Sequence, residues 1–356
     1  MPHLFDSLTI RGVTLPNRIG VSPMCQYSSI DGMANDWHFA HLGARAVGGA
    51  GLIIAEATAV TPEGRISPYD AGIWSDAHIE PLIRINKFIK QQGSVAGVQL
   101  AHAGRKASTL RPWDGNGVVS VENGGWQTIA PSPIAFGGAL THIPTEATLE
   151  DIGDIVSAFA QAAIRSEAAG YEIVEIHAAH GYLLHSFLSP LANQRTDAYG
   201  GSFENRSRLL IEVVQAVRKV WSDSKPLFVR FSASDWVEGG WTIEDTIALV
   251  IVLKSEGVDL IDCSSGGIIP NVKIPVAPSY QVPFAEAIRT QATIATAAVG
   301  MITEPKQADE IIRSGQADIV LLAREMLRNP YWALHAAREL GHQDTAKIAV
   351  QYERAF

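Results

Sequence analysis

The chain is poor in cysteine, since only Cys25 and Cys263 occur among its 356 residues. Neither lies in a metal- or cluster-spaced motif, which argues against zinc fingers and iron–sulfur clusters. A disulfide-stapled secreted domain is equally disfavoured. Residues 1–6 lack a basic segment followed by an apolar one, so no secretion signal is predicted. We therefore expect a reduced, cytoplasmic protein.

Long apolar runs and an excess of basic residues are also missing. No run approaches the roughly 20 apolar residues of a membrane span, and the longest strong candidate, Ile247 to Leu253, ends at Lys254. The formal net charge of −9 disfavours nucleic acid and anionic membranes as partners, because both need clustered Lys and Arg. The remaining composition, 47% hydrophobic and 18% charged, is that of an ordinary globular protein.

Apolar, β-rich runs recur along the chain with helical stretches between them. Most are apolar nearly throughout, as expected for parallel strands covered on both faces. Repeated β-then-α units without a break in composition predict an α/β fold, a single (β/α)8 TIM barrel over residues 1–356. An open doubly wound sheet is the alternative. The eight runs are residues 18–24, 51–57, 95–101, 172–177, 227–231, 260–263, 293–299 and 318–323.

Two regions fall outside this repeat. Residues 4–17 place Arg11-Gly12 between β-prone arms, which predicts a hairpin that plugs the barrel bottom. Residues 108–136, after the third strand, are rich in Gly, Pro and Trp and too long for a plain connection. Such an excursion on the active face is typical of a lid or a substrate wall.

The segment from His177 to Tyr182 is the most informative in the chain. Side chains three apart on a strand face opposite ways, so His177 and His180 converge only if the strand ends between them. Ala178, Ala179 and Gly181 allow that exit. Convergence places two N–H donors beside an acidic O–H, which suits a ligand oxygen whose neighbouring atom must be protonated. The alternative is one solvated histidine, one core histidine and a packed tyrosine.

Other strand ends carry polar side chains as well. Cys25 and Tyr27 share a face if the chain stays extended, although a free cysteine is more often a small buried hydrophobe. Gln99 can match a heterocycle with mixed donors and acceptors, or tie down a loop. Arg230 in an apolar strand needs a partner, either a buried carboxylate or an anionic ligand. Gly300 and Arg324 flank the position where barrels bind phosphate.

Together these ends suit a planar heterocycle with a phosphate tail, next to a carbonyl-binding histidine pair. No carboxylate pair lies at the mouth as a glycosidase needs, and there is no Gly-x-Ser-x-Gly elbow or Walker loop. Two rival functions remain. A metal-dependent hydrolase would use His177, His180 and His185 as ligands, and a sensor that binds the heterocycle would keep the site without turnover.

Several motifs resemble the Old Yellow Enzyme family of flavin ene-reductases, in its bacterial thermophilic-like branch of NADPH dehydrogenases and xenobiotic reductases. The resemblance covers essentially the whole chain. The motifs are Pro23-Met24-Cys25-Gln26-Tyr27, Gln99 to Lys106, His177 to Tyr182, and Asn193 to Ser202 with Glu204-Asn205-Arg206.

The resemblance implies non-covalent FMN on a TIM barrel, with NADPH as hydride donor and α,β-unsaturated carbonyl compounds as substrates. His177 and His180 hold the substrate oxygen, Tyr182 donates the proton, Cys25 lies near the reactive flavin edge, and Tyr27 touches substrate. The positions that match FMN contacts are Ser22, Pro23, Met24, Cys25, Ala57, Gln99, His177, Arg230, Gly300, Ala323 and Arg324.

The resemblance also concerns the C-terminal tail, residues 341–356. In this branch an arginine near the C-terminus reaches into a neighbouring subunit's site, and Arg354 matches it, which implies a homodimer or homotetramer. Two departures bear on substrate range. Val299 stands where some xenobiotic reductases carry Trp, which implies more room above the flavin, and residues 109–128 form an insertion.

Overall fold

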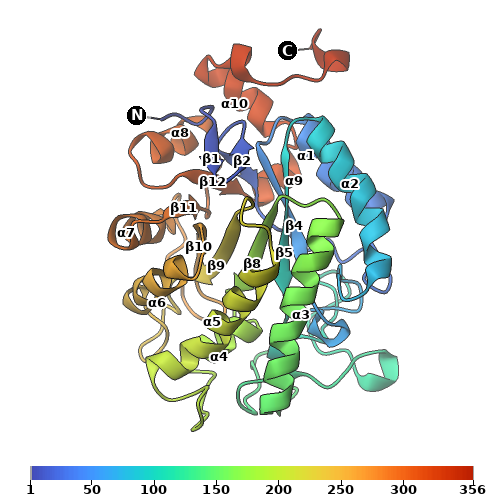
Figure 1. Ribbon diagram of the computed structural model, residues 1–356, viewed down its shortest axis with the longest axis vertical. Coiled ribbons are helices and arrows are strands. Elements are labelled where there is room, and N and C mark those ends of the chain that lie inside the picture. Colours follow the sequence, from blue (N-terminus) through green and yellow to red (C-terminus); the bar gives the residue numbers. More distant parts are fainter. Residues whose placement is uncertain (1, 356) are drawn as a thin grey trace.

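The computed structural model describes residues 2–355, and a closed barrel of parallel strands lies at its centre (Figure 1). The last barrel strand pairs with the first, so the predicted TIM barrel is confirmed and the open sheet is excluded. The strands are, in their order around the barrel, β3 (Ile19–Val21), β4 (Leu52–Ala59), β5 (Val95–Ala101), β8 (Ile173–Ala178), β9 (Leu227–Ser232), β10 (Leu260–Ser264), β11 (Ala295–Ala298) and β12 (Ile319–Leu322).

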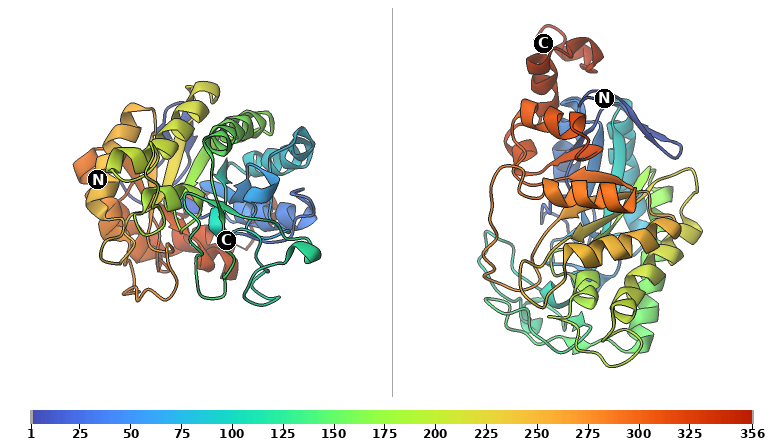
Figure 2. Two further views of the ribbon diagram at one scale, coloured as in Figure 1. Left: turned by 90° about the horizontal axis from the view of Figure 1, so that it is seen from below. Right: turned by 90° about the vertical axis from the view of Figure 1, so that its left-hand side faces the viewer.

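Helices cover the outside of the barrel (Figure 2). Their starts follow the local sequence: the Thr148 and Thr242 side chains each accept from a backbone N–H three residues on. The helices are α1 (Asp36–Val47), α2 (Ile79–Gln91), α3 (Leu149–Ala168), α4 (Leu183–Leu188), α5 (Phe203–Val220), α6 (Ile243–Ser255), α7 (Val282–Ala292), α8 (Pro305–Arg313), α9 (Arg324–Arg328) and α10 (Trp332–Leu340).

Short 3-10 helices occur in the connections and the tail. They are η1 (Pro62–Gly64), η2 (Asp76–His78), η3 (Gly104–Lys106), η4 (Val121–Asn123), η5 (Gln343–Thr345) and η6 (Val350–Tyr352). Within residues 2–355 no helix has the length and apolar character needed to cross a membrane.

The predicted N-terminal hairpin closes the bottom of the barrel. Strands β1 (Leu8–Ile10) and β2 (Val13–Leu15) pair antiparallel around Arg11-Gly12, and Arg11 has a positive φ of 50°. Val13 and Leu15 pack in one apolar cluster with the residues that begin the barrel strands, among them Leu52, Val95 and Leu260. The hairpin therefore fills the end of the barrel opposite the strand carboxyl ends.

The excursion after β5 is longer than the predicted 108–136. Gly137 and Gly138 both have positive φ, and a bridge from Gly137 to Leu140 turns the chain back. The short strands β6 (Ile129–Ala130) and β7 (Thr145–Glu146) then pair in parallel before α3 begins. Because two-residue strands carry no hydrophobic period, the sequence gives no sign of this continuation.

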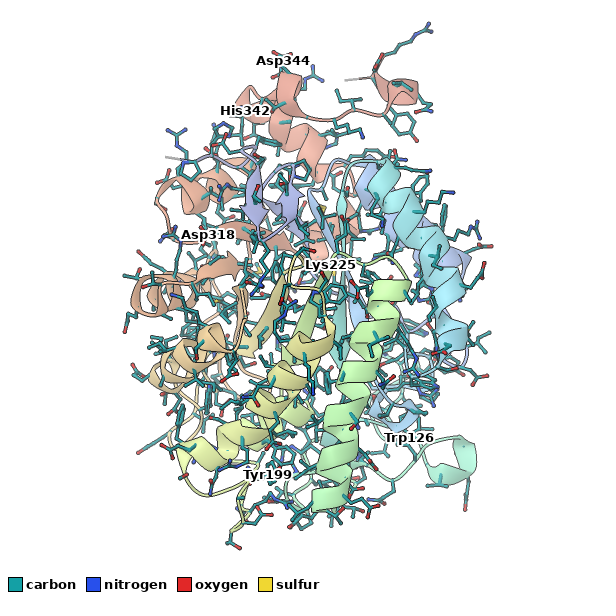
Figure 3. The ribbon with its side chains drawn as sticks, viewed as in Figure 1. Trp126, Tyr199, Lys225, Asp318, His342 and Asp344 are labelled. Atoms are coloured by element: carbon teal, nitrogen blue, oxygen red, sulfur yellow. The ribbon has the colours of Figure 1, made fainter. Side chains whose placement is uncertain are left out.

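The C-terminal tail lies at the end of the molecule away from the excursion. Figure 3 labels His342 and Asp344 at one end and Trp126 and Tyr199 at the other. The ring of His342 stacks on that of His3 with centroids 4.1 Å apart, so the tail starts beside the N-terminal residues. Beyond it the chain projects past the barrel (Figure 1).

Candidate active site

The strand register brings polar residues together at the carboxyl ends of β8, β9 and β10. Glu175 and His177 lie two apart on β8 and therefore face the same way. The backbone of His177 is the register partner of Arg230 on β9, and Arg230 is the partner of Asp262 on β10. Pairing between distant strands thus places a guanidinium beside the segment that carries the histidines.

A buried polar layer crosses the barrel interior at this level. The Gln99 amide donates to a Glu175 carboxyl oxygen at 2.8 Å, and Arg230 Nε lies 3.1 Å from an Asp262 carboxylate oxygen. Arg230 also donates to the Ser22 hydroxyl at 3.2 Å. Burial raises the pKa of Glu175 well above its ordinary value, and the Asp262 charge adds to that rise. Burial also raises the pKa of Asp262, while the Arg230 charge opposes that rise.

The chain leaves β8 through a left-handed turn at His180 and Gly181, with φ of 60° and 73°. The prediction that the strand ends between His177 and His180 is confirmed, because Ala178 is its last residue. A non-glycine residue rarely adopts this conformation without support. At His180 the backbone N–H donates to the Ser232 hydroxyl at 2.9 Å, and the carbonyl accepts from Lys106 Nζ at 2.7 Å.

This turn brings the two imidazoles and the phenol together. The His177 ring lies edge-on to the His180 ring, with centroids 5.1 Å apart, and edge-on to the Tyr182 ring at 5.0 Å. The Ala179 backbone N–H donates to His177 Nδ1 at 3.2 Å, so the neutral ring carries its proton on Nε2. His180 Nε2 lies 2.7 Å from the Ser264 hydroxyl.

All three groups are neutral at physiological pH. Burial lowers the pKa of His177 and His180 well below the ordinary value, and the nearby Arg230 charge lowers both further. Burial also raises the pKa of Tyr182 well above its ordinary value. The cluster therefore offers imidazole N–H groups as hydrogen-bond donors and a phenol that holds a proton.

Lys106 was not singled out from the sequence, although it lies in the quoted motif after Gln99. Its ammonium group donates to the carbonyls of His180 and Gly267 and lies over the ring faces of Phe136 at 4.5 Å and Tyr182 at 5.1 Å. Burial lowers the pKa of Lys106 to about 8. The sequence does not show that Lys106 supports the His180 turn, because its contacts are with loops that are distant in the chain.

Cys25 and Tyr27 lie on the segment that follows β3. Both are half-buried and pack with Tyr182 against Ile66. Burial raises the pKa of the Cys25 thiol well above its ordinary value, and the Asp70 and Glu56 carboxylates raise it further. The sulfur is therefore a neutral thiol beside the tyrosine.

A cavity of about 250 Å³ lies at the ends of β11 and β12, and we call it the anion cavity. It is lined by four of the predicted cofactor residues, namely Arg230, Gly300, Ala323 and Arg324. Gly300 has φ of 120°, and a Cβ there would lie 2.8 Å from Gln281 Nε2. The backbone can therefore approach a bound group only because this position is glycine.

Five further predicted cofactor residues lie on barrel strands or directly after one. Ala57 and Gln99 are register partners on β4 and β5. Ser22, Pro23 and Met24 follow directly after β3. Arg354, which was predicted to bind substrate, is exposed on the C-terminal tail. The tail lies at the end of the molecule away from the excursion (Figure 1).

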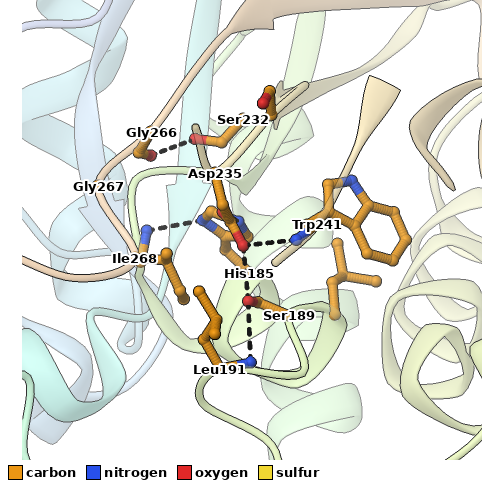
Figure 4. A network of polar contacts seen from close by, with 12 residues as sticks. His185, Ser189, Leu191, Ser232, Asp235, Trp241, Gly266, Gly267 and Ile268 are labelled. Carbon is orange, nitrogen blue, oxygen red and sulfur yellow. Dashed lines mark hydrogen bonds and ion pairs between the residues drawn. The ribbon is translucent and has the colours of Figure 1, made fainter. Parts of the chain in front are cut away.

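A second network, missed from the sequence, fixes the segment that follows Tyr182 (Figure 4). Gly181 N–H donates to His185 Nδ1 at 2.8 Å, and His185 Nε2 lies 2.9 Å from an Asp235 carboxylate oxygen. Asp235 also accepts from the Ser189 hydroxyl and the Trp241 N–H. His185 thus faces Asp235. Residues 2–355 contain no group of three or more His, Cys, Asp or Glu placed to hold a metal ion.

Comparison with known proteins identifies the family. The profile of the NADH:flavin oxidoreductase / NADH oxidase family, which binds FMN, matches residues 3–343. The chain belongs to this family. The predicted enzyme class, FMN cofactor and resemblance to Old Yellow Enzyme are therefore confirmed, and this flavin oxidoreductase has the expected barrel.

Curated relatives of this flavin oxidoreductase carry the name NADPH dehydrogenase. The protein of Geobacillus sp. (strain WCH70) is 52% identical over 99% of this chain and 98% of the relative. That of Bacillus subtilis (strain 168) is 49% identical over 99% of each. Among solved structures, the old yellow enzyme homologue from Zymomonas mobilis is 26% identical, with a TM-score of 0.78 over 98% of this chain and 96% of that one.

Morphinone reductase is a further structural neighbour of this flavin oxidoreductase. It is 29% identical, with a TM-score of 0.79 over 96% of this chain and 90% of that one. Another structure of morphinone reductase contains tetrahydroNAD. The metal-hydrolase rival is thereby displaced, since the matching family consists of flavin oxidoreductases.

The residues present fit FMN. A phosphate needs N–H donors and fixed positive charge, and the anion cavity has Arg324 and a glycine-lined backbone. The barrel interior beside it presents the Gln99 amide and the Arg230 guanidinium, both positioned by buried carboxyl groups. Amide and guanidinium donors of this kind can meet the carbonyl and nitrogen edge of a flavin ring.

Proposed function

We propose that the protein uses NADPH to reduce the C=C bond of α,β-unsaturated carbonyl compounds, such as enones and maleimides, and also nitro compounds. The observation that carries this proposal is the cluster of two neutral imidazoles and one protonated phenol at the barrel mouth. The name NADPH dehydrogenase, shared by the relatives, supports the choice of hydride donor.

In this proposal, His177 and His180 bind the carbonyl oxygen of the substrate. His177 donates from Nε2, because its Nδ1 accepts from the Ala179 backbone. His180 exchanges its contact with the Ser264 hydroxyl for the substrate oxygen, or shares it. Negative charge grows on that oxygen during hydride addition, and one preorganised donor is typically worth about 3 kcal/mol against such charge.

Tyr182 then donates its phenolic proton to Cα of the substrate. Its raised pKa keeps the proton on the phenol until a strongly basic carbon is formed beside it. General acid catalysis of this kind contributes roughly two to four orders of magnitude in rate. Lys106 holds the His180 carbonyl and lies over the Tyr182 ring, so it fixes the acid next to the donors.

FMN supplies the hydride-transfer chemistry when bound. The residues that would hold it are Ser22, Pro23, Met24, Cys25, Ala57, Gln99, His177, Arg230, Gly300, Ala323 and Arg324. Arg230 contributes a fixed positive charge, since a guanidinium does not lose its proton in a protein. Cys25 contributes a neutral thiol. NADPH and the unsaturated substrate use the same mouth in turn, which predicts ping-pong kinetics.

The protein works as a homodimer or homotetramer in this proposal, with Arg354 completing the site of a neighbouring subunit. The support is the position of the tail, which lies at the end of the molecule away from the excursion (Figure 1, Figure 3). Val350 and Tyr352 beside it are 72% and 41% exposed, as expected for residues that a partner covers.

Isotope labelling tests the reaction. The purified protein is incubated with NADPH and 2-cyclohexen-1-one in D₂O, and the product is analysed by mass spectrometry and NMR. The proposal predicts cyclohexanone as the product, with solvent deuterium incorporated at Cα. NADPH oxidation without a saturated ketone would overturn the substrate class, and a protein that binds flavin but oxidises no NADPH would be a sensor.

A further inference from the structure

A second cavity opens at the barrel mouth, beside the histidine cluster. Its volume is about 360 Å³, and we call it the extension cavity. One wall comes from the excursion and includes Leu110 and Leu140. Pro270, which lies beside Gly137 and Gly138 of the excursion, also lines the cavity, as do Tyr27 and Tyr182.

Tyr182 connects this cavity to the donors. Its ring meets the His177 ring at 5.0 Å, and the same side chain lines the cavity. A carbonyl oxygen at His177 and His180 leaves the alkene carbons beside Tyr182, because that residue protonates Cα. A substituent on the alkene then lies next to Tyr182, whose side chain also lines the extension cavity, whereas a substituent on the carbonyl carbon lies on the side of the carbonyl away from the alkene.

Two polar groups in the walls, those of Lys106 and Thr109, already have partners. Lys106 Nζ donates to the carbonyls of His180 and Gly267, and its charge lies over the rings of Phe136 and Tyr182. The Thr109 hydroxyl donates to the Ile66 carbonyl at 3.0 Å. A charged occupant would have to displace these contacts, so the cavity suits an uncharged, apolar group.

The size of the cavity also fits. A cavity of about 150 Å³ lined by apolar side chains takes up benzene, so about 360 Å³ holds a phenyl ring with room to spare.

We propose that the extension cavity binds an aryl or branched alkyl substituent on the alkene carbons of the substrate, which makes bulky β-substituted enones its preferred class. This inference rests on the proposed enone reduction. It adds which part of the substrate the enzyme selects, namely the substituent on the alkene. Leu110 and Leu140 are then specificity-determining residues.

Two isomeric ketones of one composition test the proposal. 4-Phenyl-3-buten-2-one carries its phenyl group on the alkene, and 1-phenyl-2-buten-1-one carries it on the carbonyl carbon. The ratio of their kcat/KM values is measured for the wild-type holoenzyme, for Leu140→Trp and Leu110→Trp, which narrow the cavity from two positions in the excursion, and for Leu149→Trp. Leu149 is 63% exposed at the start of α3 and serves as the matched control.

We expect both cavity variants to lower kcat/KM for 4-phenyl-3-buten-2-one, relative to kcat/KM for 1-phenyl-2-buten-1-one, by at least about tenfold, as steric discrimination in an apolar pocket allows. The control should leave the ratio within about twofold. Equal effects on the two isomers, or an effect confined to the KM for NADPH, would overturn the proposal.

Binding separates this inference from the proposed reaction. Dissociation constants of the two ketones are measured by calorimetry with the oxidised holoenzyme and no NADPH. Selective loss of 4-phenyl-3-buten-2-one binding in Leu140→Trp supports the cavity even if no ketone is reduced. If the enzyme reduces 2-cyclohexen-1-one but Leu140→Trp and Leu110→Trp bind both isomers as the wild type does, only the cavity assignment fails.

Discussion

The rings of His177 and Tyr182 meet edge to face with their centroids 5.0 Å apart, although one ends a barrel strand and the other precedes a helix. The left-handed turn at His180 produces this contact. The turn thus holds His177, which can donate a hydrogen bond to a substrate oxygen, close to Tyr182, which can donate a proton to a substrate carbon. The catalytic predictions below depend on this spacing.

Replacing His180 by alanine should weaken ligands that place an oxygen at the cluster. His180→Ala removes one imidazole donor, so we expect phenols to bind at least about tenfold less tightly and the oxidative half-reaction to slow by roughly 10²- to 10³-fold. Flavin reduction by NADPH should change less. Spectral titration with a phenol and stopped-flow kinetics measure both, and an unchanged phenol affinity contradicts the assignment.

Replacing Tyr182 by phenylalanine should separate binding from proton transfer. Tyr182→Phe keeps the ring that packs on His177 and removes only the acidic proton, so the affinity for phenols should stay within a few-fold. The oxidative half-reaction should slow by roughly 10²- to 10⁴-fold. Rapid-mixing measurements with reduced enzyme check this, and a wild-type rate of enone reduction would assign the proton to another donor.

The His185–Asp235 contact should matter for stability. Both side chains are fully buried, and Asp235→Asn removes the charge that faces His185. A hydrogen bond to a charged group contributes about 1.5–3 kcal/mol, so we expect Asp235→Asn to lower stability by roughly that amount. Thermal unfolding of the holoenzyme measures the loss, and Asp36→Asn is the control, because Asp36 is 89% exposed in its pair with Arg84. Equal melting temperatures for the two variants would contradict the argument.

The same carboxylate predicts a pH dependence. Burial alone would raise the pKa of Asp235, but His185, the Ser189 hydroxyl and the Trp241 N–H together lower it below its ordinary value. A group with a lowered folded-state pKa stabilises the protein above the unfolded value of about 3.9 and loses that contribution as pH falls through the folded value. The melting temperature of the wild type should therefore fall more steeply below pH 4 than that of Asp235→Asn.

Arg354 should act across a subunit interface. Arg354→Ala is mixed with Tyr182→Phe under conditions that exchange subunits, and the activity of the mixture is compared with the sum of the two parents. A hybrid pairs an intact cluster with an intact partner arginine, so activity should exceed that sum. Strictly additive activity would mean that Arg354 works within its own chain or not at all.

Much of the fold follows from local sequence. The eight apolar runs predict the barrel strands, and Arg11-Gly12 between β-prone arms predicts the hairpin, because both patterns are set by neighbouring residues. The end of the excursion does not follow, since β6 and β7 are two residues each and exist only through their mutual pairing.

The candidate site, like the fold, is only partly predictable from local sequence. Convergence at residues 177–182 is predictable from spacing, but the turn at His180 is not, since its backbone is held by Ser232 and Lys106 from distant segments. The sequence also leaves open whether Arg230 meets a carboxylate or a ligand. In the structure, Arg230 pairs with Asp262 on the neighbouring strand, and its side chain also lines the anion cavity.

One anaerobic experiment tests the central claim most directly. The purified protein is reduced with NADPH, 2-cyclohexen-1-one is added, and the absorbance band of the flavin is followed. The account predicts that the band bleaches with NADPH and recovers when the enone is added. Bleaching without recovery would contradict the proposed substrate class, and a band that NADPH does not bleach would contradict the proposed hydride donor.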